Sequence, residues 1–122
     1  MQMSEYFTST VTSIGKDATD MFEAGVVILF GAPCPDALAE VSVVHEGWSV
    51  EARDPRPGDI IAIGGQEAKV TKVGEIAGEN LRTLGHIVVY LDPDQNLLPG
   101  AVIAQGSLGS PTAGDRISLR SE

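Results

Sequence analysis

Residues 60–73 read IIAIGGQEAKVTKV, with a β-rich segment on each side of a pair of glycines. The two segments, residues 60–63 and 68–73, are rich in the β-branched side chains that favour strands. The connection at 64–67 contains Gly64 and Gly65, which take the positive φ angles that tight hairpin loops require. This stretch therefore predicts a β-hairpin.

Further short segments of the same character lie on both sides of the hairpin, and turn residues separate them. They are Tyr6–Ile14, Val26–Phe30, Val41–His45, His86–Leu91, Ala101–Ala104 and Arg116–Leu119. Val26–Phe30 is apolar without alternation, which indicates a strand covered on both faces. Many short strands at close spacing predict a mainly β fold, a small closed or nearly closed β-barrel of mostly antiparallel strands.

One or two short helices should accompany the strands. Within residues 75–84 the apolar side chains recur at helical spacing, and Gly85 stands where a helix C-cap is expected. Weaker signals indicate a short helix over Asp17–Phe22 and a single helical turn capped by Asp36, with Trp48 in a connection.

The composition is that of one globular domain spanning residues 1–122. The chain is 43% hydrophobic and 20% charged, and no linker or low-complexity tract divides its sequence. Its formal net charge of −9 opposes nonspecific binding to nucleic acids and to anionic membranes. We expect a partner with a basic docking face, although the same acidity would also serve simply to keep the protein soluble and monomeric.

The cysteine content and the apolar segments indicate a cytoplasmic protein. Cys34 is the one cysteine in the sequence and so has no partner for an internal disulfide. The N-terminal residues lack the basic start and the apolar stretch of a signal peptide. The longest strongly apolar run, Val26–Phe30, is far shorter than the ~20 residues that span a bilayer, so we expect no direct membrane insertion.

Two histidines are the strongest candidates for chemistry. His45 ends one expected strand on the face of Val43, and His86 begins another on the face of Val88. If these strands are antiparallel neighbours, both imidazoles lie at one rim of the barrel. A neutral imidazole is a competent nucleophile toward phosphorus, and a second imidazole can hydrogen-bond the transferred oxygens. The alternative is that both histidines are ordinary packed residues.

The residues offer less support for other chemistries. No HxH or HxxxH spacing occurs, so a metal site would need Glu46 or Asp92 to be brought in by the fold. Cys34 lies between two prolines without a local basic residue, which favours an ordinary thiol over a phosphocysteine. The glycine-rich segments lack the lysine and hydroxyl residue of a P-loop. We expect neither a metal nor an organic cofactor.

Residues 73–87 contain a longer signature, VGEIAGENLRTLGHI. It resembles the VGxxAxxNLxxLGH motif of the glucitol/sorbitol-specific IIA components of the bacterial sugar phosphotransferase system. The similarity continues in order through Gly31-Ala32-Pro33, Val43-Val44-His45-Glu46 and Leu98-Pro99-Gly100. Some members of that family have a second histidine just after the first, where this chain has Glu46-Gly47-Trp48.

The resemblance implies a phosphoryl carrier with the phosphate on His45. Phosphoenolpyruvate would feed enzyme I, then the small carrier HPr, then this chain, and then the cysteine of a sugar-specific IIB component. His86 closes the LGH motif and is the second expected catalytic residue, while Glu46, Trp48 and Val50 are expected at the docking surface. The competing hypothesis is a noncatalytic β-barrel binding module whose histidines are structural.

Overall fold

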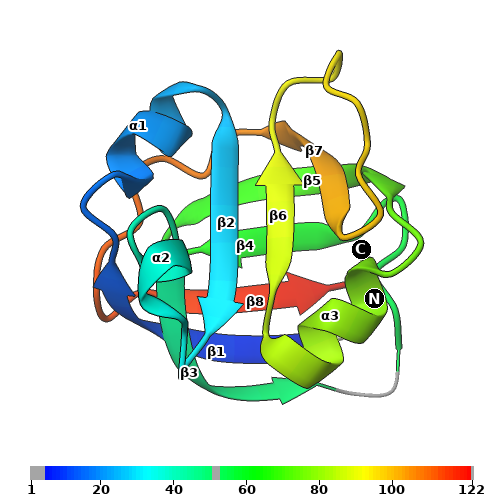
Figure 1. The fold of residues 1–122 in the computed structure, drawn as a ribbon. Coiled ribbons are helices and arrows are strands. Elements are labelled where there is room, and N and C mark those ends of the chain that lie inside the picture. The colour runs from blue at the N-terminus through cyan, green and yellow to red at the C-terminus, as the bar shows by residue number, and fades with distance from the viewer. Residues whose placement is uncertain (1–4, 51–52, 122) are drawn as a thin grey trace.

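A computed structural model describes residues 5–50 and 53–121, and in this part of the chain eight strands close into a barrel (Figure 1). The strands are β1 (Glu5–Ile14), β2 (Val26–Gly31), β3 (Val43–Val50), β4 (Ile60–Ile63), β5 (Gln66–Val73), β6 (Ile87–Tyr90), β7 (Ala101–Gly106) and β8 (Arg116–Arg120). The connections contain the short helices α1 (Ala18–Glu23), α2 (Asp36–Ala39) and α3 (Ala77–Leu84). The predicted small, mainly β barrel is confirmed, with one more short helix than the one or two expected.

Most neighbouring strands are antiparallel, as the sequence predicts. Their order around the barrel is β1-β3-β2-β6-β7-β5-β4-β8, and β4 and β5 form the expected hairpin. Gly64 turns this hairpin with a φ of +62°, a conformation that suits glycine. The parallel pairs are β2 with β3 and β6 with β7, and each needs a crossover connection between its strands.

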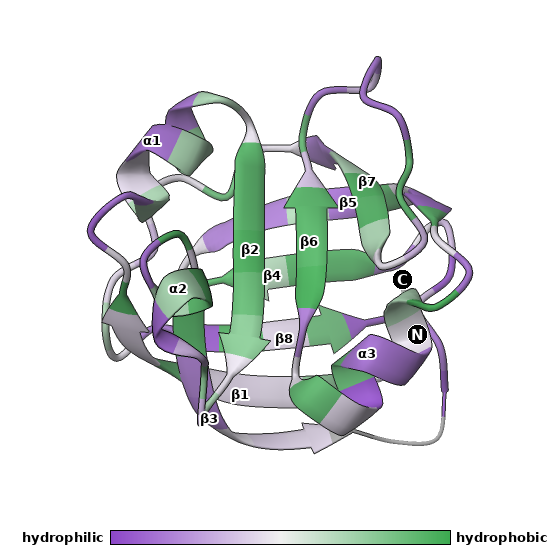
Figure 2. Ribbon diagram, viewed as in Figure 1, coloured by the Kyte–Doolittle hydropathy of each residue, from purple (hydrophilic) through white to green (hydrophobic). Residues whose placement is uncertain are grey.

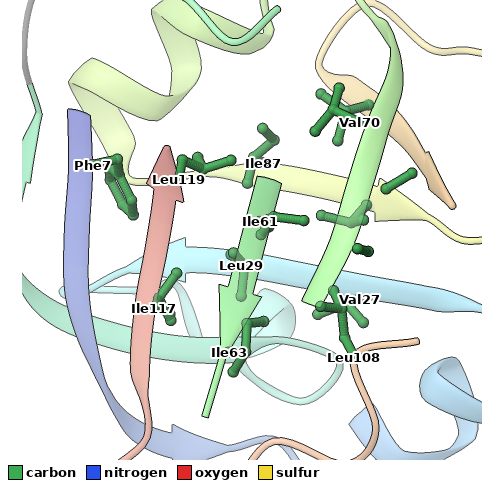
Figure 3. Packing of buried hydrophobic residues seen from close by; sticks show 14 of the residues in the cluster. Phe7, Val27, Leu29, Ile61, Ile63, Val70, Ile87, Leu108, Ile117 and Leu119 are labelled. Carbon is green, nitrogen blue, oxygen red and sulfur yellow. The ribbon is translucent and has the colours of Figure 1, made fainter. Parts of the chain in front are cut away.

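The barrel interior is packed with apolar side chains, to which all eight strands contribute (Figure 3). Alternating residues point inward, among them Leu29 of β2, Ile61 of β4 and Ile87 of β6, each 0% exposed. Burial of each such side chain stabilises the fold by about 1.5–3 kcal/mol. Because the interior is filled, binding and chemistry belong to the ends and the outer surface of the barrel.

The outer faces of β2 and β6 are also covered. Both strands are hydrophobic along most of their length (Figure 2), and no residue of β2 is exposed. Val26, Val88 and Leu97 are partly buried around a second apolar cluster that contains Tyr90 and Ile103. The continuous apolar run at Val26–Phe30 thus behaves as predicted.

One of the two helix caps expected from the sequence is present, and the other is not. α3 ends at Gly85, whose φ of +62° and N–H···O bond of 3.1 Å to Leu81 form the expected C-cap. The N-cap of α2 is Pro35, so Asp36 lies in the first turn and does not cap the helix. None of the described helices is long and apolar enough to cross a membrane.

Two expectations about the histidine-bearing strands are wrong. β3 runs from Val43 to Val50, so His45 is its third residue and does not end the strand, and Trp48 lies within the strand. β3 and β6 are not neighbours, because β2 lies between them, parallel to β3 and antiparallel to β6. Strand partners are chosen by contacts between distant parts of the chain, which a local pattern does not record.

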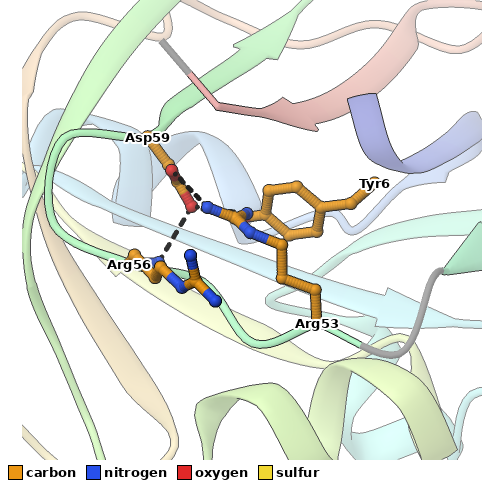
Figure 4. A network of polar contacts seen from close by, with 4 residues as sticks. All are labelled: Tyr6, Arg53, Arg56 and Asp59. Atoms are coloured by element: carbon orange, nitrogen blue, oxygen red, sulfur yellow. Dashed lines mark hydrogen bonds and ion pairs between the residues drawn. The ribbon is translucent and has the colours of Figure 1, made fainter. Parts of the chain in front are cut away.

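A buried carboxylate ties the loop after β3 to the barrel (Figure 4). Asp59 is 3% exposed and accepts two bonds of 3.0 Å from the Arg53 guanidinium, one of 2.7 Å from the Tyr6 hydroxyl and one of 2.9 Å from the Arg56 N–H. The guanidinium carbon also lies 4.2 Å from the centroid of the Tyr6 ring. Burial alone would raise the pKa of Asp59, but these donors outweigh it and lower that pKa.

Candidate functional site

His45 is fully enclosed by the fold. Its side chain lies on the same face of β3 as the core residue Val43 and is 0% exposed. The imidazole meets the rings of Phe7 and Trp48 edge-on, at centroid distances of 5.9 and 5.8 Å. A partner can reach this ring only after a neighbouring element moves.

Both ring nitrogens of His45 are hydrogen-bonded. Nε2 lies 2.7 Å from the carbonyl oxygen of Gly85, and because a carbonyl only accepts, Nε2 carries a proton and donates it. Nδ1 lies 2.6 Å from Oγ of Ser9, and in the neutral ring it accepts the hydroxyl proton. Burial lowers the pKa of His45, although the bond to Gly85 opposes the shift. The ring is therefore neutral at physiological pH.

A β-bulge in β3 turns Trp48 toward His45. The pairing register with β1 shifts around Gly47, where β3 has one residue more than its partner. Gly47 has a φ of +71°, which glycine adopts without strain. Simple alternation would put Trp48 on the opposite face from His45, and the extra residue brings its ring into contact instead.

The end of α3 closes over the imidazole. A Cβ at Gly85 would lie 2.9 Å from Cε1 of His45 and 3.0 Å from Cα of Gly31. Both this close approach and the positive φ require glycine here. Residues 82–84, the last turn of the helix, are exposed. The LGH segment thus places a helix C-cap carbonyl on Nε2 of His45.

His86 follows that carbonyl in the chain but lies on the outer face of the sheet. Its half-buried ring packs against Phe30, with 4.8 Å between centroids, while the next residue, Ile87, faces the core. Its Nδ1 donates to the carbonyl oxygen of Leu29 at 3.1 Å. Within residues 5–50 and 53–121 no hydrogen bond or ring contact joins the two imidazoles. The structure connects the two histidines through Gly85, which precedes His86 and contacts His45.

Sequence reasoning does not identify Ser9 as part of the site. Ser9 is 4% exposed, and its hydroxyl lies 2.6 Å from Nδ1 of His45. The signal that could have found it is its position between Phe7 and Val11 on the inward face of β1. A polar side chain on an apolar face needs a buried hydrogen-bond partner.

The other candidates offer less reactive chemistry. Burial, and then the carboxylate of Asp36, raises the pKa of the half-buried Cys34 thiol, which disfavours the nucleophilic thiolate. In the described part of the chain, no three His, Cys, Asp or Glu side chains converge on a possible metal position. A surface hollow of about 690 Å³ is lined by Arg53, Asp54, Arg56 and Arg82, without a histidine or a cysteine.

The stability of the fold should fall as the pH drops below 6.5, the ordinary pKa of histidine. Below that pH the unfolded chain binds a proton at His45 that the folded chain, with its lowered pKa, does not. The free energy of unfolding then falls by up to about 1.4 kcal/mol per pH unit until the folded-state pKa is reached. Urea unfolding between about pH 7.5 and 5.5 measures this slope.

The His45→Gln variant is the control for this pH dependence and should show a flatter slope. Glu5 and Asp59 titrate below this window, because their pKa values are lowered from 4.5 and 3.8. A variant slope equal to that of the wild type would contradict the assignment to His45.

Comparison with known proteins identifies the family to which the chain is similar. Residues 6–118 match the family model described as PTS system glucitol/sorbitol-specific IIA component. The chain is 31% identical over 105 residues to the PTS system glucitol/sorbitol-specific EIIA component of Shigella flexneri, and 30% identical to that of Escherichia coli K12. Each alignment covers 85% of both proteins. The crystal structure of a PTS system IIA component from Enterococcus faecalis V583 superposes with a TM-score of 0.78 at 29% identity, covering 90% of this chain and 96% of that one.

Proposed function

This chain belongs to the PTS glucitol/sorbitol-specific IIA component family, and on that premise we propose that it carries a phosphoryl group on His45. It accepts the group from phospho-HPr and passes it to the cysteine of a sugar-specific IIB component, for uptake and phosphorylation of glucitol/sorbitol. It works in the cytoplasm and needs neither a metal nor an organic cofactor.

The observation that carries this proposal is the state of the His45 ring. A neutral imidazole has the lone pair that an in-line attack on phosphorus requires. The two groups that hydrogen-bond the ring, from Ser9 and Gly85, are uncharged, and burial lowers the pKa of the imidazole. The ring is therefore available as a nucleophile once a nitrogen is uncovered.

Nε2 is the nitrogen that we assign to the phosphoryl group. Nδ1 is covered by β1, which pairs with β3 on one side and with β8 on the other. Nε2 faces the end of α3, whose last turn, residues 82–84, is exposed. Displacing a helix end disrupts far fewer contacts than opening a strand of the barrel. Phospho-HPr therefore approaches from the α3 side.

The transfer is an in-line displacement at phosphorus. Once the end of α3 moves, Nε2 gives its proton to water and Nδ1 gains one from water, so the ring stays neutral and the lone pair moves to Nε2. The Nε2–P bond forms as the bond from phosphorus to HPr breaks, and that electron pair stays on HPr. A IIB thiolate then attacks phosphorus, and the electron pair of the Nε2–P bond returns to His45.

His86 and the residues around His45 support the transfer. Nδ1 of His86 already donates to Leu29, so the ring donates from Nε2 to a phosphoryl oxygen only as a cation. The docking surface includes exposed Glu46, half-buried Trp48 and Leu84, which is 45% exposed beside the C-cap. Its apolar and acidic character suits a partner with a basic rim.

Incubation with phosphoenolpyruvate, enzyme I and HPr tests the function directly. Intact mass measurement should show the addition of one phosphoryl group, and omission of HPr should prevent it. A protein that stays unmodified while HPr itself is phosphorylated would favour a noncatalytic binding module with structural histidines.

The His86→Gln variant should still be phosphorylated on His45 but should pass the group to IIB about 100-fold more slowly, because glutamine cannot become a cation. Single-turnover transfer and melting temperature, measured on the same preparation, check this result. If His86 only packs against Phe30, the variant will lose stability while its transfer rate per folded molecule stays unchanged. That result would show that His86 is not part of the catalytic site.

A further inference from the structure

We propose that Ser9 is a positioning residue for this transfer. When the site is open, its hydroxyl accepts a hydrogen bond from protonated Nδ1 of His45 and donates to the backbone carbonyl of Glu46, which leaves the lone pair on Nε2. The inference rests on the proposed function, and it adds a residue that the sequence signature does not include.

The geometry places one hydroxyl between two acceptors. Oγ of Ser9 lies 2.6 Å from Nδ1 of His45 and 3.0 Å from the carbonyl oxygen of Glu46. Ser9 has a single proton, so it can donate to only one of them at a time. The carbonyl cannot donate at all, whereas Nδ1 donates or accepts according to its protonation.

These constraints allow two arrangements. In the resting ring Nε2 donates to Gly85, Nδ1 is the acceptor, and the Ser9 proton points to Nδ1. When Nδ1 is protonated, it donates to Oγ of Ser9, and the hydroxyl turns its own proton to the carbonyl of Glu46. In the second arrangement Nδ1 of His45, Oγ of Ser9 and the carbonyl of Glu46 each keep a hydrogen-bond partner, and Nε2 is free of its proton.

The second arrangement is the one that phosphoryl transfer needs. With Nδ1 protonated, the Nε2 lone pair can form the bond to phosphorus while the donor bond breaks and its electron pair leaves with HPr. Nδ1 keeps its proton throughout and donates it to Ser9. When the IIB thiolate takes the phosphoryl group, the electron pair returns to Nε2, and the resting hydrogen bonds to Gly85 and Ser9 form again.

Ser9 can perform this task because it does not move when the site opens. It is nearly fully buried in β1, which pairs with β3 and β8, whereas Gly85 caps α3, whose last turn, residues 82–84, is exposed. Departure of α3 therefore removes the partner of Nε2 and leaves the partner of Nδ1 in place. The ring keeps its orientation while its outer nitrogen is uncovered.

Three variants test the proposal. Ser9→Ala removes the hydroxyl, and Ser9→Thr retains one. Thr12→Val is the control, because the Thr12 hydroxyl also lies on β1 and donates to a β3 carbonyl, that of Val44 at 3.2 Å, but does not hydrogen-bond His45 in the described part of the chain. The readouts are the single-turnover rate of phosphorylation by phospho-HPr, and the ¹H–¹⁵N signal of Nδ1–H in the phosphorylated protein.

We expect Ser9→Ala to be phosphorylated about tenfold more slowly or worse and to lose the protected Nδ1–H signal. Ser9→Thr should restore both, and Thr12→Val should match the wild type. A wild-type rate with a protected Nδ1–H in Ser9→Ala overturns the role of Ser9 alone, even if threonine does not fit the site. A wild-type protein that takes up no phosphate from HPr overturns the proposed function, and this inference with it.

Discussion

The His45→Ala variant should accept no phosphoryl group from phospho-HPr, whereas the wild type accepts one. Alanine lacks the nitrogen that forms the bond to phosphorus, so we expect complete loss and not a slower rate. In the wild type the bound phosphate should be acid-labile and alkali-stable, as expected for a phosphoimidazole. Intact mass measurement after acid and alkali treatment checks both statements.

Loss of stability must be separated from loss of chemistry in this variant. Removing the buried ring leaves a cavity, removes the donor to the Gly85 carbonyl and leaves Ser9 with only the Glu46 carbonyl as a partner, so His45→Ala should also unfold more easily. His45→Gln keeps most of the volume, and it should be folded and still unphosphorylated. Cys34→Ser should accept phosphate as the wild type does. If His45→Ala still accepts one equivalent of phosphate, another residue is phosphorylated, and His86 is the next candidate.

The Asp59→Ala variant should lose about 2–4 kcal/mol of unfolding free energy. The change leaves the Arg53 guanidinium without its counter-ion and leaves the Tyr6 hydroxyl and the Arg56 N–H without an acceptor. Tyr6 is buried and Arg53 is half-buried where the loop packs on β1, so water replaces the lost bonds only in part. Urea unfolding at neutral pH measures the loss.

A second arginine–carboxylate pair provides the control for Asp59. Arg116 and Glu5 form two hydrogen bonds of 2.8 and 2.7 Å, but both side chains are largely exposed. Because water screens that pair, Glu5→Ala should cost far less than Asp59→Ala. Equal losses in the two variants would show that burial does not govern the strength of the Asp59 network.

The secondary-structure elements that are set by residues close together in the sequence could be predicted from the sequence. The β4–β5 hairpin follows from two β-rich segments around Gly64-Gly65, and α3 follows from helical spacing that ends at Gly85. The family could also be identified from the sequence, because residues 73–87 form a contiguous motif. In each case the signal lies within one stretch of chain, where propensity and turn chemistry act directly.

Only the tertiary structure decided how His45 is surrounded. The sequence indicates His45 as the reactive residue, but it does not show that Gly85 covers Nε2, that Ser9 holds Nδ1, or that a bulge at Gly47 turns Trp48 onto the ring. Nor does it show that β2 separates β3 from β6, or that His86 lies on the outer face of the sheet. These features arise because strand order and register are set by packing between segments far apart in the chain, and a single bulge reverses the face of every residue beyond it.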